Sequence, residues 1–309
     1  MEVPYATPPA TPIEPHAGRF SSTVRPIRDY EPDPDGRRAV AILGMPDDTG
    51  VKMNGGRPGA KEGPSAIRRV LARMGVDDPA SRPWPPVYDA GDVLPAGAGG
   101  DDLDETHRRV SAASKMLANA GLLPIGLGGG HDLTFAFVRG VIAGLPEDHK
   151  PRVGMYLDPH LDVREAAGSG MPFRRLVEDC GVNRLAITGF DPIVNSAEHF
   201  AWFEAHGGYR AESAYSYLPP RNAFFASLDM DAIDAAFAPG VSAMNPAGLT
   251  SQEACAWVKK VAASPNLCCL DIMELSPPHD DRDRTARLAA HLLLWALKHI
   301  HPQPECPPA

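Results

Sequence analysis

The chain has 309 residues, of which 43% are hydrophobic, and its formal net charge is −9. This acidic balance argues against nucleic acid or an anionic membrane surface as a partner, because both require clustered Lys and Arg side chains. The five cysteines form no Cys-x-x-Cys pattern, so neither a disulfide framework nor a zinc cage is indicated. No apolar run approaches the roughly 18 residues that a membrane helix needs, and the N-terminus does not resemble a signal peptide. We therefore expect a cytoplasmic protein.

Proline content separates the start of the chain from the rest. Eight of the 33 prolines precede Gly36, so we interpret residues 1–35 as an extended arm that drapes over a neighbour or is partly disordered. Residues 36–301 carry the apolar, periodic segments and are expected to form a single domain, followed by a tail at residues 302–309.

Short apolar runs then alternate with helical patterns. The expected strands cover residues 38–45, 122–127, 152–157, 184–189, 223–228 and 267–271. Four of the expected helices cover residues 64–74, 102–120, 172–180 and 282–300. A fifth is capped by Asn195 and Glu198 and ends near His206, and a sixth begins at a Thr250–Glu253 capping box. This alternation predicts an α/β protein, with a mainly parallel sheet in a three-layer α/β/α arrangement.

Two glycine-rich loops suggest a nucleotide-binding site, but neither has the required motif. The loop at residues 47–63 lacks the Gly-Lys-Ser/Thr ending of a phosphate loop. After strand 122–127, His131 occupies the third glycine position of a dinucleotide-binding Gly-x-Gly-x-x-Gly motif. The residue after it, Asp132, is expected to be a helix N-cap.

Acidic and histidine side chains follow two of the expected strands with a spacing of two. Asp158, His160 and Asp162 lie at alternate positions after strand 152–157. Asp229 and Asp231 repeat that spacing after strand 223–228. In an extended segment, alternate side chains point to the same face. Carboxylates gathered in one place repel each other and resist burial, so a bound cation best explains the cluster.

Two further candidates follow other strands of the predicted sheet. His131 comes after strand 122–127, and Glu274 comes after strand 267–271. The carboxyl ends of parallel strands meet at one edge of a sheet, so these residues are expected to join the cluster. Two His and four Asp residues exceed what one octahedral ion takes from protein, which favours two ions sharing carboxylates. Carboxylate-rich sites suit manganese better than zinc.

Each candidate also has a structural interpretation. His131 alone is compatible with a hydrogen-bonded loop histidine, Glu274 with a surface or capping carboxylate, and Asp229 with a turn residue. The two matched spacings at successive strand ends make the metal site the better interpretation.

Residues 40–290 resemble the ureohydrolase superfamily of arginases, agmatinases and formimidoylglutamases. The matching segments are GGGHDL, DPHLD, SLDMDAIDAAFAPGVSA and DIMELSPPHDDRDRTARLAA. The resemblance implies an arginase-type fold, a ureohydrolase-like catalytic domain at residues 36–301, two Mn²⁺ ions and a homo-oligomer. It implies that Asp158 and Asp229 bridge both ions, and that Glu274 accepts hydrogen bonds from the substrate's amidine or guanidine nitrogens. The remaining implied ligands are His131 and Asp162 for one ion and His160 and Asp231 for the other.

Within that superfamily, two segments resemble formimidoylglutamases. In AGSGMPF, Ser169 stands where arginases place a proton-shuttling histidine, and the loop GVKMNGGRPGAKEGPSAIR is similar as well. Arg164 replaces a smaller polar residue and is expected to bind a substrate carboxylate. Arg57 and Arg174 are weaker candidates for substrate binding, and each is equally compatible with a cation that braces a loop or is solvated.

The resemblance implies a hydrolase that converts formimidoylglutamate to glutamate and formamide by attack of a metal-bridging hydroxide on the amidine carbon. Glu274 would orient the substrate, and Asp162 or water would supply the proton to the leaving amine. An agmatinase or guanidino-acid ureohydrolase that releases urea is the first alternative. A catalytically silent, metal-stabilised protein of the same fold is the second. The presence of Glu274 beside all six expected ligands argues against it, because a structural ion needs neither an open coordination position nor a nearby carboxylate of this kind.

Overall fold

The computed structural model describes residues 1–33, 36–76, 83–99, 101–211, 213 and 221–301. The strands within these ranges are β1 Ala6–Thr7, β2 Val24–Pro26, β3 Val40–Met45, β4 Val87–Val93, β5 Leu123–Gly128, β6 Val153–Leu157, β7 Arg184–Thr188, β8 Gly208–Arg210, β9 Phe224–Asp229 and β10 Leu267–Met273. The α-helices are α1 Thr49–Met53, α2 Gly63–Leu71, α3 Leu103–Asn119, α4 Leu133–Gly144, α5 Pro172–Cys180, α6 Ala197–Ala205, α7 Ser251–Ala262 and α8 Arg284–His299.

The strands form one sheet in the order β1-β4-β3-β5-β10-β9-β6-β7-β8, with β2 beside β4. Only β1 runs antiparallel to its neighbour among the described strand pairs. Every residue of β3, β5, β6 and β9 is buried, as expected for strands that are covered on both faces. Strand β10 comes last along the chain among the described strands, yet it lies at the centre of this order.

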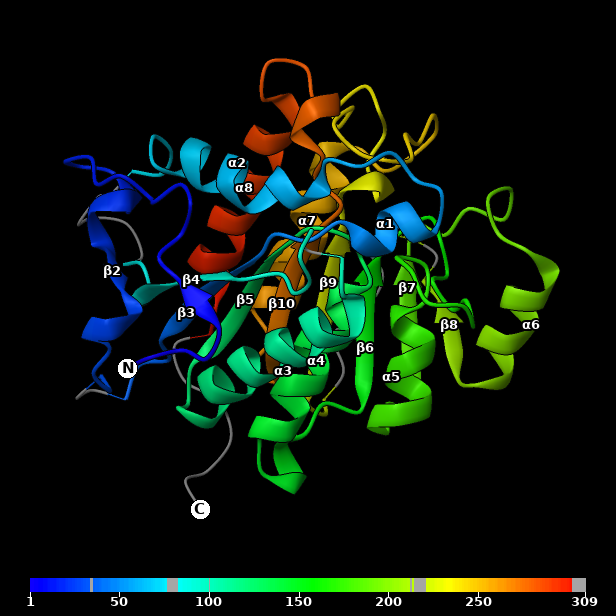
Figure 1. The fold of residues 1–309 in the computed structure, drawn as a ribbon, viewed down its shortest axis with the longest axis horizontal. Helices are drawn as coiled ribbons and strands as arrows, with labels where there is room; N and C mark the ends of the chain where they lie inside the picture. Colours follow the sequence, from blue (N-terminus) through cyan, green and yellow to red (C-terminus); the bar gives the residue numbers. More distant parts are fainter. Residues whose placement is uncertain (34–35, 77–82, 100, 212, 214–220, 302–309) are drawn as a thin grey trace.

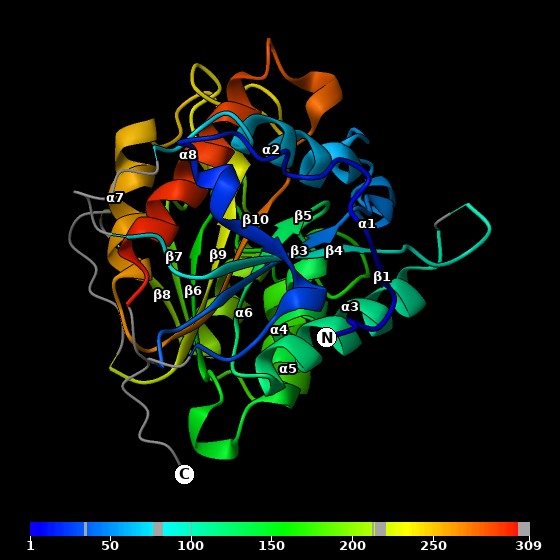
Figure 2. The ribbon, with the colours of Figure 1, turned by 90° about the vertical axis from the view of Figure 1, so that its left-hand side faces the viewer.

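Helices cover both faces of this sheet (Figures 1 and 2). Helices α2, α7 and α8 pack on one face, and α3, α4 and α5 pack on the other. The apolar stripe of α3 shows how the sequence specifies this packing, because Leu103, Val110 and Leu117 recur at heptad spacing and all three are buried. The prediction of a three-layer α/β/α fold with a mainly parallel sheet is confirmed.

Strand β4 was not expected from the sequence, because it carries two carboxylates. Asp89 and Asp92 face the guanidinium of Arg68, which comes from α2 and is fully buried. Arg68 Nη2 lies 2.9 Å from Asp89 Oδ1. Arg68 offsets one of the two negative charges and donates hydrogen bonds to both carboxylates, so a polar segment can form an internal strand.

The first 33 residues lie against the chain's own sheet. Strand β1 pairs with one side of β4, and β2 runs parallel to β4. Phe20 is fully buried and its ring centroid lies 4.8 Å from that of Trp84. The described part of the arm is therefore held by backbone pairing and by an aromatic contact.

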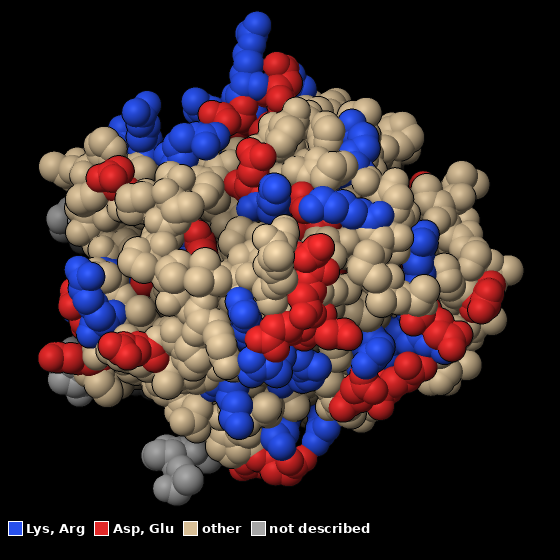
Figure 3. Space-filling view, in the orientation of Figure 1, with Lys and Arg blue, Asp and Glu red and all other residues tan. Residues whose placement is uncertain are grey.

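Charged side chains of both signs are interspersed over the face shown in Figure 3. Within the described ranges, no helix is both long enough and apolar enough to span a membrane.

Two predicted helix starts have different outcomes. The capping box is confirmed, because Thr250 Oγ1 accepts from Glu253 N and the Glu253 carboxylate accepts from Thr250 N. The cap assigned to Asn195 is wrong, because Ser196 caps α6 by accepting from His199 N. Asn195 instead bonds the loop after β6, where its Oδ1 accepts from Leu161 N at 2.9 Å.

Candidate metal centre

The predicted metal ligands and Glu274 come from the ends of four adjacent strands. His131 follows β5, Asp158 follows β6, Asp229 ends β9, and Glu274 follows β10. These strands lie side by side in the order β5-β10-β9-β6. Residues that are more than a hundred positions apart in the chain therefore meet at one edge of the sheet, as expected for parallel strands.

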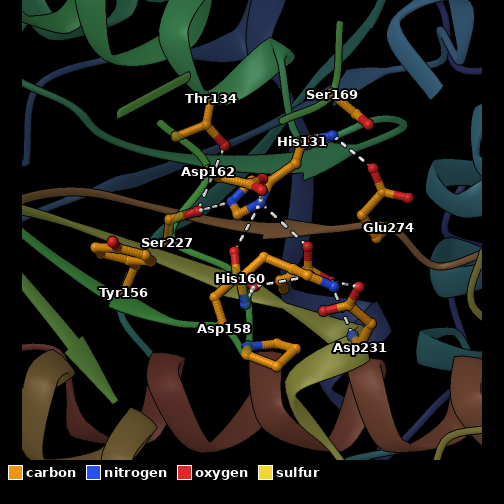
Figure 4. Close-up of polar contacts among 12 residues, drawn as sticks. His131, Thr134, Tyr156, Asp158, His160, Asp162, Ser169, Ser227, Asp231 and Glu274 are labelled. Atoms are coloured by element: carbon orange, nitrogen blue, oxygen red, sulfur yellow. Dashed lines mark hydrogen bonds and ion pairs between the residues drawn. The ribbon is translucent and has the colours of Figure 1, made fainter. Parts of the chain in front are cut away.

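One group of side chains surrounds the imidazole of His131 (Figure 4). His131 Nδ1 lies 3.2 Å from Asp158 Oδ2, 3.0 Å from Asp162 Oδ2 and 3.1 Å from Asp229 Oδ2. All four side chains offer donor atoms that lie within 4.8 Å of one another. This set has the composition and the spacing of a metal-binding site.

A second group shares Asp158 with the first. His160 Nδ1 lies 3.4 Å from Asp158 Oδ1 and 3.4 Å from Asp231 Oδ2. Asp158 therefore presents one oxygen to each group. Asp229 belongs only to the first group in this arrangement, and its Oδ1 accepts a hydrogen bond from Asp231 N at 2.8 Å. The two groups together still comprise the six residues expected as ligands.

The unpartnered atoms of this cluster fit a pair of cations. His131 Nδ1, Asp158 Oδ2 and Asp231 Oδ1 are buried, and none has a hydrogen-bond partner among the described residues. Burial and repulsion from Asp231 and Asp158 raise the pKa of Asp229 well above its usual range. Buried lone pairs that face one another without donors need positive charge between them, which two metal ions would supply.

A hydrogen-bonded chain behind His131 orients its ring. His131 Nε2 lies 3.0 Å from Ser227 Oγ, and Ser227 Oγ donates to Asp271 Oδ1 at 2.5 Å. Because the serine hydrogen is used by Asp271, the serine oxygen accepts from His131 Nε2, which leaves Nδ1 free for a metal. Sequence reasoning missed both residues, although Ser227 lies two positions before Asp229 in β9 and Asp271 lies in the next strand.

The Glu274 carboxylate lies beside the metal-ligand cluster. Glu274 Oε1 accepts from the main-chain N–H of His131 at 2.8 Å, and the main-chain N–H of Glu274 donates to Gly129 O. Glu274 and Asp162 are both non-glycine residues with positive φ, of 63° and 48° respectively. Such strained backbone persists where the surrounding structure holds it, and it clusters at functional sites. Burial and repulsion from Asp229 raise the pKa of Glu274 well above its usual range.

Asp132 occupies the N-cap position of α4 but does not cap it. Its side chain makes no cap hydrogen bond, so the expected capping role is wrong. Asp132 Oδ2 instead lies 2.7 Å from His107 Nε2, and both side chains are buried. The pair fixes the residue next to His131 against α3.

A cavity of about 170 Å³ opens onto the metal-ligand cluster. Its inner wall is formed by ligand side chains and Glu274. Its outer wall includes Arg164, Ser169 and Asn54, of which Asn54 was not singled out from the sequence. Arg164 is the only cationic Lys or Arg side chain among the lining residues in the described part of the chain.

The other two arginines lie elsewhere. Arg57 donates from Nε to Ser242 O at 2.9 Å and from Nη2 to Val241 O at 2.7 Å. Arg174 donates to Glu178 at 2.9 Å. Neither is among the residues that line the cavity, and the Arg57 guanidinium braces a loop that forms part of its wall.

The comparisons with known proteins agree with this geometry. The arginase family matches residues 38–298. A formimidoylglutamase of Aromatoleum aromaticum is 37% identical, with 85% of this chain and 84% of the relative covered. The structure of a Trypanosoma cruzi formiminoglutamase with Mn²⁺ aligns with a TM-score of 0.76 at 27% identity, covering 87% of this chain and 95% of that one. The formimidoylglutamase of Bacillus subtilis aligns with a TM-score of 0.77 at 25% identity, covering 94% and 92%.

The matched family, the strand-end ligands and the shared fold lead to one conclusion. This chain belongs to the arginase family.

Proposed function

We propose that the protein hydrolyses formimidoylglutamate to glutamate and formamide. The observation that carries this proposal is the pairing of Glu274 with Arg164 along one cavity, the first beside the metal-ligand cluster and the second at the outer wall. An amidine needs an acceptor for its N–H groups, and a glutamate moiety needs a cation for its carboxylate. The relatives named formimidoylglutamase support the same assignment.

The proposed cofactor is a pair of Mn²⁺ ions held by the two groups that share Asp158. Imidazole and carboxylate donors without thiolate suit this metal, and the Trypanosoma cruzi relative was solved with it. When bound, such ions lower the pKa of a water molecule and offset the negative charge that develops as the amidine carbon is attacked.

The chain's own residues would then orient the substrate. Glu274 Oε1 is already used by His131 N, so Oε2 accepts from the amidine nitrogens. Arg164 holds a carboxylate of the glutamate moiety in a bidentate contact. Asp162 lines the same cavity and passes a proton to the leaving amine.

The remaining proposals concern the whole molecule. We propose a cytoplasmic homo-oligomer in which residues 36–301 form the catalytic domain. Residues 1–33 are then the described part of an N-terminal arm, and the expected tail at residues 302–309 lies outside the described residues.

The main rival is a ureohydrolase that acts on a guanidino compound, because Glu274 accepts equally well from guanidine nitrogens. A silent protein of the same fold is the rival from another class. The cavity beside the metal-ligand cluster argues against it, since a purely structural ion needs no access for a substrate.

A turnover assay distinguishes these functions. The purified, manganese-loaded protein is given formimidoylglutamate and a panel of guanidino compounds, and glutamate and urea release are measured. Glutamate release that is lost in Glu274→Gln is the expected result. Urea from a guanidino compound would favour the ureohydrolase, and no product from any of them would favour the silent protein.

A further inference from the structure

Asn54 lies at the outer wall of the cavity and contacts the loop that carries Ser169. It is the residue that follows α1, and it is half-buried. Three donors face one end of its side-chain amide: Ser169 Oγ at 2.9 Å, Ser169 N at 3.2 Å and Gly170 N at 2.7 Å. An amide nitrogen cannot accept from main-chain N–H groups, so this end is the carbonyl oxygen of Asn54.

The position of that oxygen fixes the direction of the Ser169 hydroxyl. Two oxygens that lie 2.9 Å apart need a hydrogen between them, and only Ser169 can supply it. The hydroxyl hydrogen therefore points at Asn54. Among the described residues, the Ser169 hydroxyl has no other polar partner, so the lone pairs of its oxygen remain available. Ser169 can accept from a substrate but cannot donate to it.

The same loop carries Arg164. The main-chain N–H of Arg164 donates to Gly170 O at 2.8 Å. A Cβ at Gly170 would lie 3.0 Å from Arg164 Nε and 3.2 Å from the Asn54 amide, so both side chains lie against the same glycine. At Gly168, where φ is +144°, a Cβ would lie 2.3 Å from Asn54. The loop can approach Asn54 this closely only because it carries glycine at both positions.

We propose that Asn54 is a positioning residue that makes Ser169 a hydrogen-bond acceptor toward the substrate, beside the guanidinium of Arg164. The wall that results recognises an N–H group next to a carboxylate, and it does not donate a proton. This wall fits the nitrogen and the α-carboxylate of a formimidoyl-amino acid. The substrate part of the inference rests on the proposed function, whereas the role of Asn54 does not.

The test is a double-mutant cycle of Asn54→Ala and Ser169→Ala, with Asn54→Asp as the conservative variant. Asn54→Ala removes the acceptor of Gly170 N and of the Ser169 hydroxyl, whereas Ser169 N keeps Gly50 O at 3.0 Å, so KM should rise about tenfold while kcat changes less than about threefold. Asp keeps the acceptor oxygen and should restore much of the thermal stability lost in Asn54→Ala. If Asn54 acts through Ser169, the fold increase in KM of the double variant should be well below the product of the fold increases of the two single variants.

Asn183→Ala is the matched control, because Asn183 is an exposed residue of the loop before β7. It should leave KM and thermal stability unchanged. Additive effects of Asn54→Ala and Ser169→Ala on both KM and the melting temperature would overturn the proposal. So would an Asn54→Asp variant that is as unstable as Asn54→Ala.

The result stays separable from the proposed function. A wild-type protein that does not turn over formimidoylglutamate would contradict that function, and the cycle would then be run on whichever amidine or guanidino compound is accepted. Thermal stability reports the coupling of Asn54 and Ser169 without any substrate. A coupled melting temperature together with an inactive wild type would therefore support the Asn54 contact and reject only the substrate.

Discussion

The main-chain N–H of His131 donates to Glu274 Oε1 over 2.8 Å, so the ends of β5 and β10 are joined at the catalytic edge of the sheet. A glutamine at position 274 keeps an oxygen for this hydrogen bond, but its NH₂ group donates at the position where Glu274 Oε2 would accept from the amidine. We therefore expect Glu274→Gln to remain folded and to lower kcat about 100-fold. Steady-state kinetics measure this, with Glu178→Gln, an exposed carboxylate on α5, as the control. Equal losses in both variants would contradict the role of Glu274.

Removal of the metal ions should destabilise the protein, because the buried carboxylates then repel one another. Burial and repulsion from Asp231 and Asp158 raise the pKa of Asp229, so Asp229→Asn should leave the melting temperature of the chelated protein nearly unchanged. In the manganese-loaded protein the same substitution should lower the melting temperature, since a ligand is lost. Thermal melts with chelator and with MnCl₂ measure both effects. A wild-type melting temperature that is the same with and without chelator would contradict the metal site.

Arg164→Ala should affect binding more than chemistry. Arg164 is an exposed residue that lines the cavity and does not belong to the metal-ligand cluster, so its loss removes a contact that is present before and during the reaction. We expect KM for formimidoylglutamate to rise at least about tenfold, with kcat within a few-fold of wild type. Arg174→Ala is the matched control, because Arg174 pairs with Glu178 outside the cavity. A similar KM for the two variants would argue against the binding of the substrate carboxylate by Arg164.

Adjacent arginines on α2 should differ sharply in their effect on stability. Arg68→Met leaves the buried Asp92 and the half-buried Asp89 without their cation and should lower the free energy of unfolding by about 3–5 kcal/mol. Arg69→Met breaks an exposed pair with Asp283 and should cost less than about 1 kcal/mol. Urea denaturation measures both values. A small effect of Arg68→Met would mean that β4 does not need the ion pair.

His291 should give α8 a pH-dependent contact. Its Nε2 accepts from Trp295 Nε1 at 2.9 Å, which requires a neutral ring. Burial and the charge of Lys259 lower the pKa of His291 below 6.5. Because this pKa is lowered on folding, neutral His291 contributes to folding stability above pH 6.5. That contribution is lost as the pH falls from 6.5 through the pKa of His291 in the folded protein. Trp295 fluorescence should change over that range, and the change should be absent in His291→Gln. A transition that persists in this variant would assign it to another group.

Local patterns were enough to predict which residues come together in the metal-ligand cluster. Asp158, His160 and Asp162 are close in sequence, and their alternate spacing identifies a shared face before any tertiary structure is known. The ends of parallel strands then bring His131 and Asp231 to the same edge. This reasoning needs only the order of strands and helices, which the apolar periodicity supplies.

Supporting residues could not be predicted, because their partners lie far away in the chain. Asn54 bonds a loop more than a hundred residues later, and Asn195 bonds the loop that follows β6. An isolated asparagine in a polar segment is typical of turns and caps, which is why Asn195 was assigned to the wrong role. Strand β4 was missed for the related reason that its two carboxylates are paired with Arg68, a residue on another element.

The central place of β10 has a consequence for synthesis of the chain. Strand β10 separates β5 from β9, yet among the described strands it is made last by the ribosome, at residues 267–273. A nascent chain that lacks it has two unpaired strand edges and no fixed distance between His131 and Asp229. Metal capture must therefore follow release of most of the polypeptide, so premature termination before residue 267 should yield chains that cannot retain the ions.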